Sequence, residues 1–486
     1  MNTTVRIAIA LAATAVASPL PAQDAGLKAH LVMTTGSPTT EAMFWRAYND
    51  LLHHFETRAR PTLDSILALD PNVGLARLLR AHAHYLASPS LSPAERTKEL
   101  ERGLQDVTAL SVPEREFAHG LAAASEGKLE AAEAIFRQLS DRLPDDPYAA
   151  LEHANALRRL ARHGGLIALQ DVRRRFPTFA PVHMPLAYAL YEAGDTAAAV
   201  HQGQSYAAAA PEQPYSHYVS ARMLLAAGHL RAAAQAMRPV LDLPRSWFDP
   251  VEQFATVEQK AGNGAAARRV LGAVGRHSGT LEDVSRRLRY LAISYLYDGQ
   301  VDSARVTLRA SANRAVQQGT TAEAVLSLRF LALLEGASGA KDSAAAALSS
   351  AAGLEGSEQT AAHHVFSAQS LALAGDLDAG NDHIEKLEAA ASVNGGADQA
   401  IQITRALLRA LAGDGEGALD QLGEYRTAAD LPFAFIAADY ALGALGKVNE
   451  RQAARRAWLT RHESINLRSL PLALARLRAE GRAPMK

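Results

Sequence analysis

Apolar positions along this chain recur in a pattern of paired helical segments that are separated by a glycine. A small residue lies within an apolar helical segment, a Gly follows it, and a second segment carries Ala and a larger apolar residue. Copies of this pattern surround Gly127, Gly194, Gly228, Gly262 and Gly299. Gly194, Gly228 and Gly262 follow one another at steps of 34 residues. Because self-similarity at a fixed period of this size indicates a repeat array, the pattern predicts an all-α chain of stacked helix pairs.

The spacing resembles that of the tetratricopeptide repeat (TPR) family. Seven places before the inter-helix Gly, this family has a small residue, found here as Ala47, Ala81, Gly120, Ala154, Ala187, Ala221, Ala255, Ala292, Ala332, Ala368 and Ala406. Five places after the Gly it has Ala, and nine places after it a large apolar residue, as at Ala132 and Phe136. The resemblance implies a right-handed α-solenoid of about eleven to twelve antiparallel helix pairs, whose concave surface binds partners.

The intervals between the small residues divide the repeat region into two parts. They are 33 to 39 residues up to Ala255 and 36 to 40 residues after it, so we expect a regular array over residues 38–260 and an irregular one over 261–460. A last pair is expected near residues 432–460, without a clear small residue. Asp70-Pro71 and the segment Pro211–Tyr215 also resemble junctions of secreted bacterial TPR proteins.

The N-terminus has the composition of a secretory signal peptide. Arg6 precedes the apolar run 7–17, and small residues and prolines follow it up to Ala22. A charged start, a short apolar core and a small-residue exit are typical of such a peptide. We therefore expect a signal peptide over residues 1–22, a linker over 23–37, and export to the periplasm or the extracellular space.

Composition and motifs argue against several classes of function. The chain has no Cys, which excludes disulfides and a thiol nucleophile, and its formal net charge of −1 gives no reason to expect a nucleic-acid partner. Gly262-Asn-Gly-Ala-Ala-Ala267 resembles a dinucleotide-binding loop, but it follows a predicted helix instead of a strand, so we interpret it as a repeat turn. The His53-His54, His82-x-His84 and His363-His364 pairs lack the spacing that places two metal ligands on one helix face. We predict no catalytic residue, cofactor or metal.

Tyrosines gather on the face that the repeat register predicts to be concave. Tyr and Arg are enriched among residues that dominate binding energies. The predicted partner-binding groove consists of Tyr48, Tyr85, Phe117, Tyr148, Asn155, Arg158, Met184, Tyr188, Tyr191, Tyr215, Tyr218 and Arg222.

We therefore predict a non-catalytic, exported TPR scaffold that binds a protein or peptide segment on its concave face. Two alternatives remain: a helical-toroid enzyme that processes glycans, which requires a pair of carboxyl groups in a pocket, and a structural subunit of a cell-envelope assembly. Residues 461–486 are basic, and we expect them to form a solvated C-terminal cap or tail.

Overall fold

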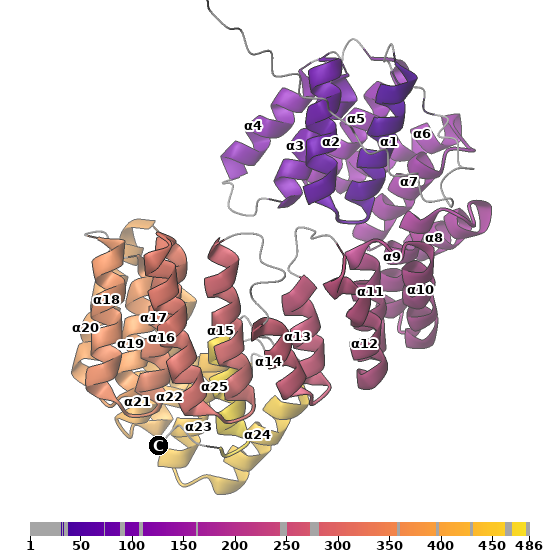
Figure 1. Ribbon diagram of the computed structural model, residues 1–486. Coiled ribbons are helices and arrows are strands. Elements are labelled where there is room, and N and C mark those ends of the chain that lie inside the picture. Colours follow the sequence, from indigo (N-terminus) through magenta and orange to yellow (C-terminus); the bar gives the residue numbers. More distant parts are fainter. Residues whose placement is uncertain are drawn as a thin grey trace, which may run out of the picture. The chain divides into compact units, whose positions relative to one another are not determined.

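A computed structural model of the chain describes residues 31, 33 and 37–482, except 72, 88–92, 106–109, 162–163, 244–249, 273–280, 357–359, 395–397, 428–430 and 462–468. The predicted signal peptide and most of the predicted linker lie outside this part. The described residues form helices and no strand (Figure 1). They divide into two compact units: unit 1 extends to Ala227, and unit 2 begins at Gly228.

Unit 1 consists of five helix pairs and one further helix. In chain order they are α1 (Pro38–Leu52), α2 (Glu56–Leu69), α3 (Gly74–Ala87), α4 (Pro93–Leu104), α5 (Val112–Ser125), α6 (Leu129–Arg142), α7 (Pro147–Arg159), α8 (Gly164–Arg175), α9 (His183–Glu192), α10 (Thr196–Ala209) and α11 (Pro214–Ala226). The first helix of each pair has an odd number, and these helices form the inner layer on which the predicted groove residues lie.

Unit 2 begins with α12 (Leu230–Met237). It continues with six pairs and ends with one additional helix: α13 (Pro250–Lys260), α14 (Gly264–Gly272), α15 (Leu281–Tyr297), α16 (Val301–Gln317), α17 (Thr321–Ala337), α18 (Lys341–Glu355), α19 (Ala361–Leu373), α20 (Leu377–Asn394), α21 (Asp398–Leu411), α22 (Gly415–Leu422), α23 (Pro432–Ala444), α24 (Val448–Arg461) and α25 (Leu470–Ala479). The predicted all-α solenoid of about eleven to twelve antiparallel helix pairs is confirmed.

The predicted small positions lie where helices approach each other most closely. Nine of them are alanines with 0% exposure: Ala47, Ala154, Ala187, Ala221, Ala255, Ala292, Ala332, Ala368 and Ala406. At Gly120 a Cβ atom would lie only 2.7 Å from the Phe136 ring, and Phe136 is the large apolar residue of the same pair. A larger side chain at this position would separate the two helices, which is why the family pattern requires a small one.

The inter-helix turns explain the repeated glycine. Gly127, Gly194, Gly228 and Gly262 have φ angles between 77° and 84°, a conformation that costs side-chain-bearing residues about 1 kcal/mol or more. His54 and Ala161 occupy the same place in the pairs of Ala47 and Ala154. They are the two described residues other than Gly with positive φ, at 54° and 52°. Glycine therefore recurs at this position because the turn requires a positive φ angle. This also explains Gly262 in the predicted turn over residues 262–267.

The boundary between the two units is distinct from the change in repeat regularity predicted at residue 260. It lies at Ala227 and Gly228, within the sixth pair of the ladder. The interval of 40 residues between Ala292 and Ala332 reflects longer helices: α15, α16 and α17 contain 17 residues each, whereas α13 contains 11 and α14 contains 9.

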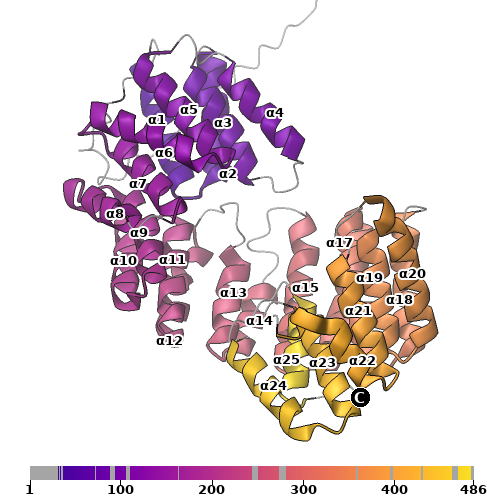
Figure 2. The same cartoon turned by 180° about the vertical axis from the view of Figure 1, so that it is seen from behind.

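The prediction of a solvated C-terminal cap is wrong for α25. This helix packs against α15, α17 and α23 of the inner layer of unit 2 as well as against α24 (Figure 1; Figure 2). Seven of its ten residues are buried, among them Leu470, Leu474 and Arg478. Arg482, just beyond the helix, donates a 3.1 Å hydrogen bond to the Tyr297 carbonyl at the end of α15. Helix α25 is therefore part of the core of unit 2.

Candidate partner-binding surface

Helix α1 lies across the inner layer of unit 1 and covers part of the predicted groove. The Tyr48 hydroxyl donates a 2.9 Å hydrogen bond to Glu152 on α7. The Tyr48 ring packs edge-on against Phe117 of α5, with 5.3 Å between ring centroids, and Trp45 stacks on Tyr148 at 4.7 Å. The first helix of the array therefore contacts the fifth and seventh helices as well as its own partner.

This arrangement corrects two of the predicted groove residues. Tyr48 is 2% exposed and Phe117 is 0% exposed, so neither can contact a partner while α1 is in place. Tyr48 of α1 packs directly on Phe117, so α1 covers this part of the predicted groove. Tyr148 is half-buried beneath Trp45. The Tyr85 side chain lies outside the described residues.

The turn between α1 and α2 attaches to the far end of unit 1. His53 Nδ1 and the Tyr206 hydroxyl of α10 form a 2.6 Å hydrogen bond, and both side chains are buried. Burial lowers the pKa of His53 to about 3, so the imidazole is neutral at pH 7. The next residue, His54, packs its ring on Tyr215 of α11 with 4.5 Å between centroids. The contact with Tyr215 offers a physical reason for a histidine where other pairs have glycine.

Four tyrosines and an arginine on α9 and α11 lie beyond the part of the inner layer that α1 covers, and they remain at least partly exposed to solvent. We call this set the tyrosine surface: Tyr188, Tyr191, Tyr215, Tyr218 and Arg222. Tyr191 is 45% exposed, Arg222 is exposed, and the other three are half-buried. Since the helices present them at successive turns on one inner face, the set combines apolar ring area with hydroxyl groups and one cation.

The tyrosine surface is held together by contacts between α9 and α11. The Arg222 guanidinium lies 5.1 Å from the centroid of the Tyr188 ring, and its Nη1 donates a 3.5 Å hydrogen bond to the Tyr188 hydroxyl. Tyr215 and Tyr218 pack with 5.4 Å between centroids. Burial and the neighbouring tyrosines raise the pKa of Tyr215 well above its usual range, so its hydroxyl stays protonated. These contacts restrict the side chains before any partner binds.

The remaining predicted groove residues lie beside this surface. Met184 and Asn155 are half-buried on α9 and α7. Arg158 is half-buried as well, and its Nη1 donates a 3.1 Å hydrogen bond to Glu192 at the end of α9. Trp45, His54 and Glu192 were missed by the sequence pattern, because their role depends on the return of α1 and on contacts between neighbouring pairs.

The acidity of the Glu152 carboxyl group on α7 is shifted by its surroundings. Burial raises its pKa to about 7, although the hydrogen bond from Tyr48 and the charge of Arg159 lower it. Its Oε1 atom accepts the hydrogen bond from the Tyr48 hydroxyl of α1. Glu152 therefore lies where α1 covers the inner layer of unit 1.

The described residues contain neither a metal-binding group nor a membrane-spanning helix. No group of three or more His, Cys, Asp or Glu side chains there has an arrangement that could hold a metal ion. None of the described helices combines the length and the apolar character that crossing a membrane requires.

Comparisons with known proteins give structural similarities only. No protein-family model matches the chain, and no curated protein matches its sequence. Among solved structures, it is similar to a tetratricopeptide repeat protein from Parabacteroides merdae, with 14% identity over 61% of this chain and 98% of that one and a TM-score of 0.32. It is also similar to a chain in the structure of Naa15/Naa10 bound to HypK-THB, with 13% identity over 91% and 79% of the chains and a TM-score of 0.24. The helix-pair architecture itself rests on the packing described above.

Proposed function

We propose that this protein is an exported, non-catalytic scaffold that binds a protein or peptide segment at the tyrosine surface of unit 1. The observation that carries the proposal is that Tyr191 and Arg222 are exposed on the same two helices that carry three half-buried tyrosines. Tyrosine combines a large apolar ring with a hydroxyl group, and Tyr and Arg are enriched at the centres of protein interfaces. The mutual packing of these rings reduces the conformational entropy that a partner must remove on binding.

A photo-crosslinking amino acid at position 191 tests this proposal in the native host. A matched control carries the same amino acid at Leu69 on α2, which is 68% exposed and lies away from the tyrosine surface in sequence and element. We expect a specific protein to crosslink at position 191 and not at position 69.

The double variant Tyr191→Ala/Arg222→Ala then tests the energetic role of the surface. Both side chains are exposed, so their removal leaves the core intact. Loss of hot-spot residues weakens binding by about thirtyfold or more. Tyr295→Ala is the control, because Tyr295 is a half-buried tyrosine with Arg268 at 5.0 Å from its ring centroid but belongs to unit 2. Equal loss of partner from both variants would contradict the proposal.

Export is tested separately from binding. N-terminal sequencing of the protein from envelope and culture fractions should find a mature chain that starts after Ala17 or Ala22. Recovery of the chain only from the cytoplasm with an intact N-terminus would disprove export and leave the binding proposal to the crosslinking experiment.

A further inference from the structure

The last helix pair departs from the repeat pattern at all three of its signature positions. Its inter-helix glycine is Gly446, with a φ of 65°. Seven places before it, where the other pairs have a small residue, lies Asp439; five and nine places after it lie Arg451 and Arg455 instead of Ala and a large apolar residue. The aspartate explains why no small residue can be found for this pair in the sequence.

The three residues that stand at the signature positions form hydrogen bonds with one another in the interior of unit 2. Asp439 is 0% exposed. It accepts two hydrogen bonds from Arg451 at 3.1 and 2.9 Å and two from Arg455 at 2.6 and 2.9 Å. Arg478 of α25 adds a fifth at 2.7 Å, and its guanidinium lies 3.3 Å from the Tyr440 ring centroid. Three arginines from two helices therefore converge on one carboxylate.

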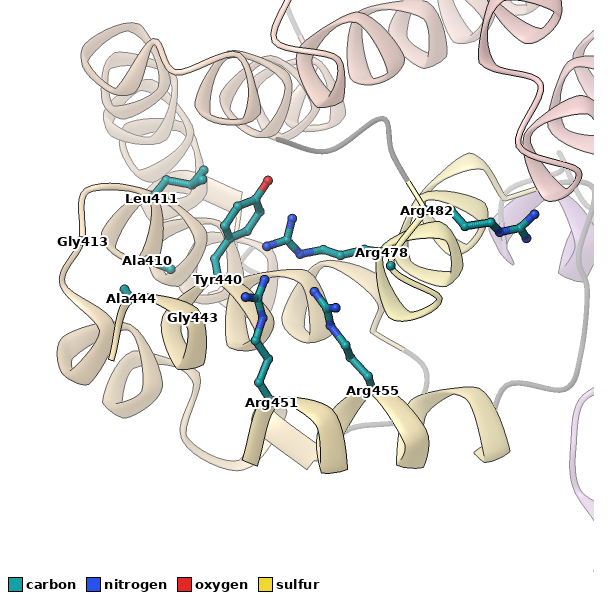
Figure 3. Close-up of a pocket in the computed structure, with 11 residues that line it drawn as sticks. Ala410, Leu411, Gly413, Tyr440, Gly443, Ala444, Arg451, Arg455, Arg478 and Arg482 are labelled. Carbon is teal, nitrogen blue, oxygen red and sulfur yellow. The ribbon is translucent and has the colours of Figure 1, made fainter. Parts of the chain in front are cut away.

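The arginines also line a pocket of about 610 Å³. The pocket is formed by the end of α21, by α23, by α24 and by α25 with the residues after it. Its lining consists of Ala410, Leu411, Gly413, Tyr440, Gly443, Ala444, Arg451, Arg455, Arg478, Gly481 and Arg482. In Figure 3 the side chains of Arg451 and Arg455 extend from α24 toward Tyr440, while Arg478 reaches in from α25. The volume lies within the range of small-molecule sites.

Among the described residues that form the pocket, arginines outnumber carboxylates. Asp439 neutralises one of the three arginines that contact it, and Arg482 pairs with Glu480 at the rim. Arg451 and Arg455 each direct Nε and Nη2 at Asp439, and their Nη1 groups have no hydrogen-bond partner in the part of the chain that the structure describes. The aspartate thus fixes the orientation of two guanidinium groups that retain donors toward the pocket.

Stability alone gives little reason for this arrangement. Burying ion pairs is often neutral or unfavourable compared with apolar residues of similar volume, and the other pairs achieve the same helix packing with Ala and one apolar plug. An arrangement that combines an apolar wall with oriented and excess guanidinium groups matches the requirements of anion recognition.

We propose that this pocket in unit 2 binds a small organic oxyanion. Its carboxylate or phosphate group accepts hydrogen bonds from the Nη1 groups of Arg451 and Arg455. Its apolar part lies against Leu411 and Tyr440. The site is separate from the tyrosine surface of unit 1 and does not depend on the function proposed for that surface.

Isothermal titration calorimetry on the full chain at low ionic strength tests the proposal. The probes are phenyl phosphate, benzoate, and benzamide as the neutral analogue of benzoate. We expect saturable one-site binding of phenyl phosphate or benzoate and none of benzamide, and the tighter of the two anions identifies the oxyanion. Arg455→Gln should weaken binding at least about tenfold, because a hydrogen bond between charged groups is worth about 1.5–3 kcal/mol. Arg456→Gln, an exposed neighbour outside the pocket lining, should change it less than about twofold.

Ala444→Trp provides a second test that leaves every arginine in place. Ala444 is exposed and lines the pocket, so an indole there fills the space for the ligand without a change in charge. It should abolish binding even if Arg455→Gln fails to fold. The proposal is overturned if neither anion binds up to about 10 mM (a Kd of this size corresponds to less than about 3 kcal/mol), if benzamide binds as well as benzoate, or if Arg456→Gln and Arg455→Gln weaken binding equally.

Discussion

Replacing Asp439 by alanine removes the carboxylate on which Arg451, Arg455 and Arg478 converge. Burial alone would raise the pKa of Asp439, but hydrogen bonds from Arg455 and Arg451 and the charge of Arg478 lower it to about 2 from an ordinary 3.8. A shift of this size corresponds to about 2.5 kcal/mol of stabilisation of the ionised form. The substitution also leaves Arg478, whose side chain is 5% exposed, without its buried counter-charge. Breaking a buried ion pair in this way costs about 3–5 kcal/mol.

We therefore expect Asp439→Ala to reduce the free energy of unfolding of unit 2 by about 3–5 kcal/mol. Native-state hydrogen exchange measures this unit by unit, and amides of α23 and α25 should exchange about a hundredfold faster or more. Amides of α5 and α7 in unit 1 serve as the internal control and should be unchanged. Exchange that accelerates less than about fivefold in unit 2 would refute the importance of the buried charge.

A multiple variant tests the comparison with the other pairs. Asp439→Ala, Arg451→Ala and Arg455→Leu restore the small residue, the alanine and the apolar plug, and Arg478→Met removes the remaining buried charge. This combination should recover most of the stability lost in Asp439→Ala, because replacing a complete buried ion cluster by apolar residues is often neutral or stabilising. Failure to exceed the stability of Asp439→Ala would show that the repeat register assigned to this pair is wrong.

Three further predictions concern the helix packing of each unit. Tyr206→Phe should destabilise unit 1 by about 1–3 kcal/mol in urea unfolding followed by α10 exchange, because it leaves the buried His53 nitrogen without its hydroxyl partner. Burial lowers the pKa of His53 to about 3 and that of His183 to about 4. The contribution of each neutral histidine to the stability of unit 1 is therefore complete above about pH 6.5 and is lost as the pH falls toward 4. Urea unfolding over a pH series should show a loss of about 3 kcal/mol or less for each histidine. Gly336→Ala places a Cβ 2.2 Å from a backbone oxygen and should lower the Tm more than Gly194→Ala, which meets no atom within 4 Å and strains only its backbone at φ 84°.

The periodic part of the fold is predictable from sequence because each helix pair has the same local packing, with a small residue at the same helix contact. Ala187, Ala221 and Ala255 could be placed at helix contacts from spacing alone, and all three are 0% exposed. The return of α1 could not be predicted in this way. The hydrogen bond between Tyr48 and Glu152 joins residues 104 positions apart, and the bond between His53 and Tyr206 joins residues 153 apart. Such contacts follow from the curvature of the unit, which no single repeat determines.

The candidate binding surfaces, too, could be predicted from the sequence only in part. The register assigned Tyr188, Tyr191 and Tyr218 to one helix face, yet it could not indicate which residues α1 covers. At Asp439 the relevant signal was present in the sequence, seven places before Gly446. An acidic residue at a position reserved for a small one, with arginines at both complementary positions, would have identified the buried cluster without a structure.

Both units place one of their own helices on the inner layer, and this limits where a partner can bind. A stack of helix pairs leaves apolar side chains on its inner face, and covering them with a helix of the same chain stabilises the unit without a ligand. In unit 1 this helix is α1, which contributes Tyr48 and Trp45; in unit 2 it is α25, which contributes Leu474 and Arg478. A partner that used the covered parts would first have to displace a helix whose contacts include buried hydrogen bonds. Inner-face residues beyond the covering helix can bind a partner without such displacement, and in unit 1 these include the tyrosine surface of α9 and α11.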